Sequence, residues 1–323
     1  MIIINKNNVV KNYLPESLIR KMYENCFGTI IGKFSIEQLY GGLKNAVYLI
    51  KNDGKKIVLK VSPKNNSKTL TVDKNNMWWE AKMLEKMNKL RIPSPKLILF
   101  DNSGSICRDD YIFMSYIRGQ TYSQIKEQLP LKNRKRIEYK LGSIAKIISS
   151  VEVNNYFLPS QPSKKFNDNY EFVLNLFSNL FNDLKCNNVL IKSSIVKEVY
   201  EILNTNKEAI NNVKKIVLCA TDMWDGNILI KNGRLCGIVD FNDVYFCDEL
   251  MTFYFHSIDS TISKCFLKGY NKKNFSLDEK IRIQIYKLYV ILKMIADCKI
   301  KKYRNFSWMF EVYYRIIDEI KKI

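Results

Sequence analysis

The stretch ATDMWDGNILIKNGRLCGIVDF, residues 220–241, decides the fold and locates a candidate site. Two apolar runs flank an Asn-Gly pair at 232–233, and Asn-Gly between apolar segments is a strong sequence signal of a β-hairpin. Folding the chain at this turn brings Asn227 and Asp240 to the same end of the hairpin, offset by about two residues, or roughly 7 Å. Asp222, on the loop just before the hairpin, then points into the same space.

These three side chains fit two interpretations. An amide oxygen and a carboxylate held close together can bind Mg²⁺, which takes few protein ligands and fills its shell with phosphate oxygens and water. Asp222 would then be the group that meets an acceptor molecule. The alternative is a solvated polar turn with two surface acids, and the spacing alone does not separate the two interpretations.

The composition is that of a globular protein. Of the 323 residues, 46% are apolar and 26% are charged. No stretch reaches the roughly 18–20 consecutive apolar residues that span a bilayer, and the start MIIINKNN lacks the features of a secretory signal, so we expect a cytoplasmic protein. The eight cysteines include no CxxC pair, which favours reduced thiols. With His256 as the single histidine, catalysis would rest on carboxylates, lysine and metal.

The net charge of +20 has two possible meanings. Such an excess of basic residues can mark a protein that binds nucleic acid or phosphate. The densest basic stretch, residues 131–146, also carries the apolar residues Ile137, Leu141 and Ile144 at helical spacing. We therefore favour a solvated helix face over a nucleic-acid surface, because no RNA- or DNA-binding motif accompanies the charge.

The pattern of apolar residues divides the chain into a β-rich part and a helical part. Residues 36–62 have the alternation of strands with an Asn-Asp-Gly turn, a helix follows from about residue 74, and a further strand is expected within 110–119. Beyond residue 119 the chain is mostly helical, apart from the hairpin described above. Helices are predicted over 133–152, 168–186, 194–213, 278–299 and 307–321. The sequence thus predicts an α+β architecture of two lobes.

Two charged residues in the β-rich part stand out. Lys60 is a lone charge in the apolar strand segment IVLKVS, where burial is costly without a partner. Glu80 lies twenty residues further on, on the predicted helix, between apolar neighbours. A buried ion pair that joins strand to helix accounts for both, and it is the arrangement by which kinases hold the lysine that binds nucleotide phosphates. Alternatively, both side chains reach solvent.

The order of these parts supports a site more strongly than any single part does. A glycine pair at 41–42, the strand lysine, the helix glutamate, the acidic loop, the hairpin and Asp-Phe follow one another along the chain. The segments LYGGLKNAVYLI, IVLKVSP, WWEAKML, YIFMSYIRGQT, TDMWDGNILI and GIVDFNDVYFCDE resemble the aminoglycoside phosphotransferase and choline kinase superfamily, small-molecule kinases with a protein-kinase-like fold. The resemblance extends over about residues 36–256.

The resemblance implies a nucleotide-binding lobe at residues 1–115, with an antiparallel sheet and one helix. The lobe at 116–323 would be mostly helical with an embedded hairpin, and would carry the catalytic loop, the metal site and the acceptor-binding region. ATP or GTP, Mg²⁺ and a small molecule with a hydroxyl group are the expected ligands. The implied roles are as follows: Lys60 binds the α- and β-phosphates and Glu80 fixes it; Gly41, Gly42 and Asn45 shape the loop above the phosphates; backbone groups from Ser115 to Ile117 hold the adenine with Met114 behind it; Asp222 accepts the proton of the acceptor hydroxyl; Asn227 and Asp240 bind Mg²⁺.

The sequence departs from the family pattern at several positions. Ala220-Thr221 stands where the family usually has His-Gly, and that histidine normally supports the catalytic loop, so the rigidity of this loop is an open question. Lys44 replaces a Ser or Thr, Ser115 replaces a Glu, and Cys247-Asp248-Glu249 replaces Gly-Asp-Pro. None of these changes removes the phosphate lysine, the base or a metal ligand, so we expect an active kinase.

The acceptor is open at this stage. Acidic residues near the hairpin could receive a polycationic aminoglycoside; they are Asp225, Asp243, Asp248 and Glu249. The charge of +20 instead suits a neutral or anionic sugar, an amino alcohol or a phosphorylated metabolite. A non-catalytic, kinase-like module that binds nucleotide or RNA is the alternative function. A protein kinase is disfavoured, because no insertion of activation-loop size follows Asp240.

Overall fold

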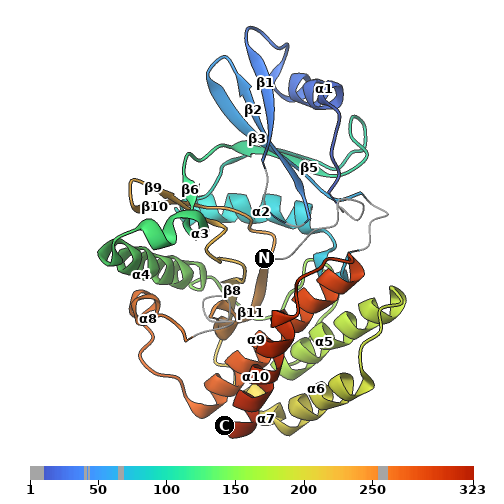
Figure 1. The fold of residues 1–323 in the computed structure, drawn as a ribbon, viewed down its shortest axis with the longest axis vertical. Coiled ribbons are helices and arrows are strands. Elements are labelled where there is room, and N and C mark those ends of the chain that lie inside the picture. Colours follow the sequence, from blue (N-terminus) through green and yellow to red (C-terminus); the bar gives the residue numbers. More distant parts are fainter. Residues whose placement is uncertain (1–10, 40–41, 43, 65–68, 254–260) are drawn as a thin grey trace.

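The first part of the chain is an antiparallel sheet of five strands in the order β1-β2-β3-β5-β4 (Figure 1). The computed structural model describes residues 11–39, 42, 44–64, 69–253 and 261–323, so Gly41 and His256 lie outside the described residues. The strands are β1 (Phe34–Leu39), β2 (Ala46–Asn52), β3 (Lys55–Val61), β4 (Leu97–Asp101) and β5 (Tyr111–Ser115). The predicted β2–β3 turn is present, with φ angles of 45° at Asp53 and 80° at Gly54, as a tight hairpin turn requires.

Each face of this sheet is covered by a helix, because successive side chains of a strand point to opposite faces. Leu59 and Phe113 pack with α1 (Glu16–Phe27) on one face. Val58 and Ile112 belong to the large core that includes α2 (Asn76–Lys89) on the other. The predicted helix is α2; α1 is an additional one, and its signal in the sequence was the i, i+3, i+4 spacing of its buried residues Ile19, Met22 and Tyr23.

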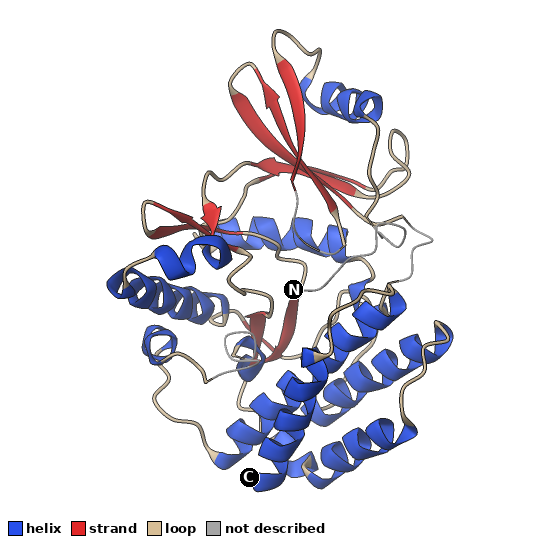
Figure 2. Cartoon of the chain, viewed as in Figure 1, coloured by secondary structure: helices blue, strands red, loops and turns tan. Residues whose placement is uncertain are grey.

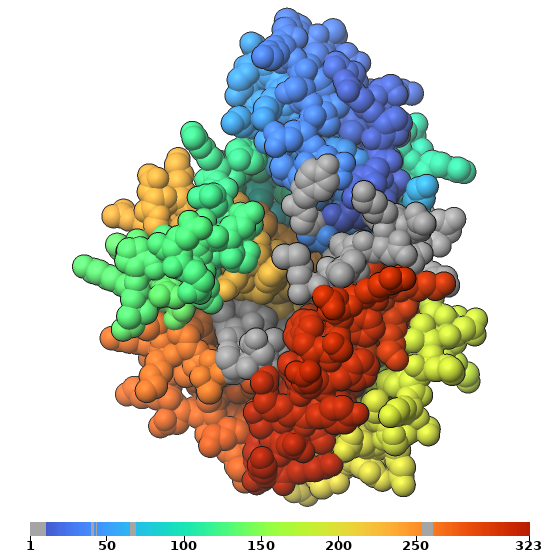
Figure 3. All heavy atoms as spheres, in the orientation of Figure 1, coloured from blue at the N-terminus to red at the C-terminus, as the bar shows by residue number. Residues whose placement is uncertain are grey.

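The rest of the chain is mostly helical, as predicted (Figure 2). Its helices are α3 (Tyr122–Ile125), α4 (Leu131–Ile148), α5 (Asn169–Cys186), α6 (Ser193–Thr205), α7 (Lys207–Asn211), α8 (Lys264–Tyr270), α9 (Leu277–Ile300) and α10 (Trp308–Lys322). The predicted helix over 194–213 is in fact two helices, α6 and α7, which meet at Asn206. In the space-filling view α9 and α10 (red) lie beside α5 and α6 (yellow-green to yellow), whereas α4 (green) and α8 (orange) form the opposite side (Figure 3).

The predicted hairpin is β9 (Ile228–Lys231) and β10 (Arg234–Ile238), with positive φ at both turn residues. It is part of a three-stranded sheet with β6 (Gln120–Thr121). A second small sheet, not predicted from the sequence, consists of β7 (Glu152–Val153), β8 (Ile216–Ala220) and β11 (Val244–Asp248). Its β8 and β11 strands are the segments just before and just after the hairpin. Their pairing brings the two ends of the candidate site side by side.

The basic stretch at 131–146 lies on α4, whose Ile137 and Leu141 are buried. This helix packs very closely on α8. A Cβ atom on Gly142 would lie 2.1 Å from the carbonyl oxygen of Phe266, so the contact is possible only because position 142 has no side chain.

The architecture as a whole is α+β, with an antiparallel N-terminal sheet and a helical C-terminal part that contains the hairpin (Figure 1). Among the described residues, no helix is both long and apolar enough to cross a membrane.

Candidate active site

The strand–helix ion pair expected from the sequence is present. Lys60 lies on the face of β3 that is turned toward α2, and its side chain is buried. Its Nζ atom lies 2.6 Å from Glu80 Oε2 and 2.6 Å from Asp240 Oδ1. Burial lowers the pKa of Lys60, but the charges of Asp240 and Glu80 outweigh it and hold the pKa above its ordinary value. One ammonium group therefore connects the N-terminal sheet, α2 and the segment that follows the hairpin.

The two carboxylates that share Lys60 differ in environment. Glu80 is 1% exposed, and burial raises its pKa to about 7, because the nearby Asp240 partly cancels the effect of Lys60. The side chain of Asp240 is 30% exposed and so remains reachable from the solvent. Asp240 also has a φ of 66°, an uncommon conformation for a residue with a side chain. Such backbone strain persists only where the surroundings impose it, and it is concentrated at functional sites.

The hairpin brings Asn227 and Asp240 together more closely than the spacing suggested. The pairing register shifts between Leu235 and Gly237, so that Ile228 faces Ile238 and Asn227 O accepts a hydrogen bond of 3.0 Å from Val239 N. Asp240 is therefore one residue beyond the partner of Asn227, whereas the sequence predicted an offset of about two. The cause is a β-bulge at position 236, which adds a residue to one strand.

Asp222 lies directly beside Asn227. The Asn227 amide donates hydrogen bonds from Nδ2 to Asp222 Oδ2 at 2.9 Å and to the Asp222 carbonyl at 2.8 Å. Burial, with the charges of Asp243 and Asp240, raises the pKa of Asp222 above its ordinary value, against the opposing charges of Lys293 and Lys44. General bases are commonly carboxylates whose pKa is shifted from its ordinary value toward the working pH.

The oxygen atoms of this site fit Mg²⁺. With Nδ2 of Asn227 engaged by Asp222, its Oδ1 atom is the group left to face a cation, and Asp240 contributes a partly exposed carboxylate. Amide and carboxylate oxygens are the donors that Mg²⁺ takes from proteins, in small number. In the described part of the chain, no group of three or more His, Cys, Asp or Glu side chains forms a metal site, so any Mg²⁺ would depend on oxygens from a bound phosphate.

The other residues expected to contact a nucleotide lie on or beside β2 and β5. Gly42 has a φ of 58° and is exposed, and Asn45 precedes β2. Met114 is buried near the end of β5. The backbone N–H of Ser115 donates to the Lys96 carbonyl at 2.9 Å and is therefore not available to a nucleotide.

The side chain of Ile117 packs against Gly237. A Cβ atom on Gly237 of β10 would lie 2.8 Å from Ile117 Cδ1, so the connector between the sheet and the helical part packs directly on the hairpin.

The four acids considered as an aminoglycoside pocket all have partners within the chain. Asp225 pairs with Lys126 at 2.8 Å, and Asp243 pairs with Lys293 at 2.9 Å. Glu249 accepts a hydrogen bond from the Tyr270 hydroxyl at 3.1 Å. Each of these charges already has a partner within the chain.

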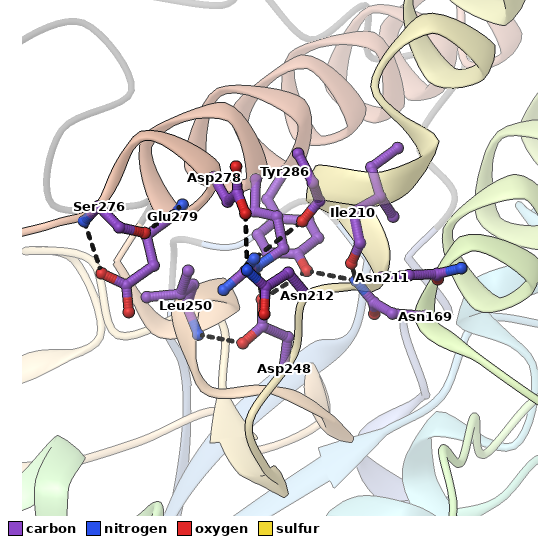
Figure 4. Close-up of polar contacts among 12 residues, drawn as sticks. Asn169, Ile210, Asn211, Asn212, Asp248, Leu250, Ser276, Asp278, Glu279 and Tyr286 are labelled. Carbon is purple, nitrogen blue, oxygen red and sulfur yellow. Dashed lines mark hydrogen bonds and ion pairs between the residues drawn. The ribbon is translucent and has the colours of Figure 1, made fainter.

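Asp248 is the clearest case, because it lies in a buried polar cluster (Figure 4). It accepts hydrogen bonds from Arg282 Nε at 2.8 Å and from the Tyr286 hydroxyl at 2.7 Å, both on α9. Asn169 of α5 donates in turn to the Tyr286 hydroxyl and to the Ile210 carbonyl of α7. The cluster joins β11 to three helices, so the contacts of Asp248 stabilise the fold and leave its buried carboxylate little access to an acceptor molecule.

Sequence reasoning missed Lys293, which lies on α9 and contacts Asp243. A signal was present, since Lys293 interrupts the apolar run YVILKMIA in the same way that Lys60 interrupts its strand. It also gave no role to Trp224, which is 49% exposed two residues after Asp222 and folds its ring over Gly226. An apolar cavity of about 430 Å³ lies elsewhere, between α5, α6, α9 and α10, and none of the site residues lines it.

The structure combines a strand lysine paired with a helix glutamate and, at the open end of a hairpin, an aspartate and an asparagine, which is the arrangement expected of a kinase-like phosphotransferase. Residues 35–251, more than half of the chain, match the model of the phosphotransferase enzyme family, and the chain belongs to this family. It is accordingly a small-molecule kinase by family.

Solved structures of similar fold include a thermostable mutant of aminoglycoside phosphotransferase APH(4)-Ia in its apo form, with 14% sequence identity, 93% of this chain and 98% of that chain covered, and a TM-score of 0.66. The streptomycin–ATP ternary complex of APH(2")-IIa has 16% identity, covers 97% of this chain and 98% of that chain, and gives a TM-score of 0.62. At such identities the likeness shows a shared fold. A search of curated protein sequences finds no match.

Proposed function

We propose that the protein transfers the γ-phosphoryl group of ATP, with Mg²⁺, to a hydroxyl group of a small molecule. The observation that carries the proposal is the double contact of Lys60, 2.6 Å from both Glu80 and Asp240. A buried lysine between two carboxylates is oriented and permanently charged, and is ready to bind the phosphates of a nucleotide. In this proposal residues 1–115 bind the nucleotide and residues 116–323 carry the catalytic loop and the acceptor region.

Each polar side chain of the site has a part in this reaction. Lys60 binds the α- and β-phosphates while Glu80 fixes its position. Asp222 orients the acceptor hydroxyl and takes its proton as the oxygen forms a bond to the γ-phosphorus and the bond to the leaving ADP oxygen breaks. The hydrogen bond from Asn227 to Asp222 Oδ2 holds the carboxylate in one orientation and leaves its other oxygen for the substrate. Catalysis of this kind depends on positioning and charge neutralisation.

Asn227 and Asp240 would hold the metal ion, and when bound it supplies positive charge that offsets the phosphates. Gly41, Gly42 and Asn45 are proposed to shape the loop over the phosphates. Met114, Ser115 and Ile117 are proposed to line the adenine site. Because the Ser115 N–H is engaged by Lys96, its carbonyl and the backbone of the next residues are the groups proposed to meet the base.

The proposed acceptor is a neutral or anionic hydroxylated molecule, such as a sugar, an amino alcohol or a phosphorylated metabolite. The support is that the nearby acids are engaged by Lys126, Lys293 and Arg282 and so offer a polycation little unpaired negative charge. An aminoglycoside is the second candidate. It is favoured by the fold shared with enzymes whose structures contain streptomycin, gentamicin and hygromycin B.

An acceptor panel with ADP release as the readout tests the proposal. We expect turnover with at least one hydroxylated acceptor, loss of that turnover in EDTA, and recovery with Mg²⁺. Asp222→Asn should lower turnover by about 10²- to 10⁴-fold and leave ATP affinity unchanged, because an amide cannot accept the proton. Asp225→Asn, the same change three residues away, is the matched control and should retain most activity. Full turnover by Asp222→Asn, or salt-dependent RNA binding with no response to ATP, would refute the proposal.

A further inference from the structure

Thr221, the residue before Asp222, makes an unusual double contact. It is 1% exposed, and both its N–H and its hydroxyl donate to one acceptor, the carbonyl oxygen of Asp243, at 2.9 and 2.8 Å. Two hydrogen bonds to the same carbonyl fix both the backbone and the side chain of Thr221. The catalytic loop is thereby attached to the segment that carries Asp240, three residues before Asp243.

Whereas the backbone carbonyl of Asp243 contacts Thr221, its side-chain carboxylate contacts two other residues. Its Oδ1 atom accepts a hydrogen bond from the Tyr245 hydroxyl at 2.5 Å and another from Lys293 Nζ at 2.9 Å. Burial raises the pKa of Asp243, but the charges of Lys293 and Lys44 and the Tyr245 hydrogen bond outweigh burial and hold the pKa well below its usual range. The Asp243 side chain is therefore charged, and its Oδ1 atom is held by two donors.

Besides Asp243, Lys293 lies near a second carboxylate, that of Asp73. Its Nζ atom lies 3.9 Å from Asp73 Oδ1, and the same Asp73 oxygen lies 2.7 Å from Lys44 Nζ. Lys44 belongs to the connection between β1 and β2, and Asp73 to a short 3₁₀ helix before α2. Alternating charges thus run from Asp243, whose carbonyl the catalytic loop contacts, through Lys293 of α9 to Lys44, beside the loop expected above the phosphates.

We propose that Thr221 and Lys293 are positioning residues for Asp222. Thr221 attaches the catalytic loop to the segment that carries Asp240. Lys293 binds the carboxylate of Asp243 and so keeps the Asp243 carbonyl in position to accept the hydrogen bonds of Thr221. The inference rests on the proposed function. The support that the family resemblance led us to expect from a histidine before Asp222 comes here from the Thr221 hydroxyl and from Lys293 of α9. Ala220 itself contributes only its place in β8, opposite Val244.

The test compares Thr221→Val, which keeps the shape and loses the hydroxyl, with Thr221→Ser, which keeps the hydroxyl. We expect kcat in Thr221→Val to fall by about 10- to 100-fold with the KM for ATP unchanged, because a small displacement of a catalytic group has effects of this size. Thr221→Ser should recover most of kcat. Thr252→Val is the matched control, since Thr252 is equally buried at 1% exposed but lies in the 3₁₀ helix after β11.

Hydrogen–deuterium exchange of residues 217–230 gives a readout that needs no phosphoryl transfer. Exchange should be faster in Thr221→Val than in the wild type, Thr221→Ser and Thr252→Val. The inference is wrong if Thr221→Val leaves both kcat and exchange within twofold of the wild type, or if Thr252→Val has the same effects. Faster exchange in Thr221→Val, combined with no turnover of any acceptor by the wild type, would refute the proposed function and not the hydrogen-bonded link.

Lys293 is tested in the same way, with Lys293→Met removing the charge and Lys293→Arg keeping it. We expect Lys293→Met to lower kcat and to speed exchange over residues 217–230, and Lys293→Arg to be affected less in both. Equal kcat in the two variants and the wild type would overturn the role given to Lys293.

Discussion

The pairing of Lys60 allows a sharp test of how much burial decides the strength of an ion pair. Lys60 and Glu80 are 2.6 Å apart, with side chains 6% and 1% exposed. Lys51 and Glu37 are 2.7 Å apart in the same sheet, with side chains 40% and 56% exposed. The two pairs have nearly the same N–O distance but differ in their access to water, and Lys60 also contacts a second carboxylate, Asp240.

Removing Lys60 leaves the charges of Glu80 and Asp240 without compensation, whereas removing Glu80 leaves Lys60 paired with Asp240 alone. Lys60→Met should therefore lower the free energy of unfolding by about 3–5 kcal/mol, and Glu80→Gln should also be destabilising. The double variant should cost less than the sum of the two, because Glu80 is then no longer a buried charge without its lysine, and a coupling energy of about 0.5–3 kcal/mol is expected. Lys51→Met, the control, should cost about 0–1 kcal/mol because water screens the exposed pair.

Urea unfolding followed by circular dichroism measures these differences, and the thermal shift caused by ATP with Mg²⁺ measures nucleotide binding. Lys60→Met should lose the ATP shift, and Lys51→Met should keep it. Equal costs for Lys60→Met and Lys51→Met, or strictly additive effects of Lys60→Met and Glu80→Gln, would refute the reasoning. An ATP shift preserved in Lys60→Met would separately argue against Lys60 as the phosphate-binding residue.

Two further predictions concern the acceptor and the fold. Trp224→Ala should raise the KM for the acceptor about 10-fold and leave the KM for ATP unchanged. The reason is that the exposed ring, two residues after Asp222, can contribute about 1–3 kcal/mol by contact with a substrate. Equal changes in both KM values would contradict this. Gly142→Ala, which in most helices would stabilise by about 0.5–1 kcal/mol, should destabilise here because the new Cβ would overlap the Phe266 carbonyl. The exposed Lys140→Ala on the same helix is the control, and a raised melting temperature in Gly142→Ala would disprove the close approach of α4 and α8.

Local signals in the sequence were enough for the main elements. The Asn-Asp-Gly and Asn-Gly turns specify their hairpins because both turn residues must adopt positive φ, which these residue types tolerate. The ion pair of Lys60 with Glu80 followed from one charge on an apolar strand and one on an apolar helix. Helix α1 could have been found by the same spacing argument, whereas the short strand β7 carries too few residues to give a periodic signal.

Signals of this kind do not say which distant residues become partners in the folded chain. The bulge at Cys236 reduces the offset between Asn227 and Asp240 by one residue. The acids Asp225, Asp243 and Asp248 looked like a pocket in the sequence because they are close in number. Only the folded chain brings each of them a partner. Asp225 pairs with Lys126, directly after α3, while Asp243 and Asp248 pair with Lys293 and Arg282 of α9.

The sequence by itself determined the family, the order of the two parts of the chain and the residue types of the site, since these depend on neighbours within a few positions. The tertiary structure decided what each charge does. Lys293 is 72 residues from Thr221 in sequence but is joined to it through Asp243, and Lys60 contacts Asp240 across 180 residues of sequence. The physical reason is that electrostatic and hydrogen-bond energies depend on distance in space and on burial, and both are fixed only when the chain is folded.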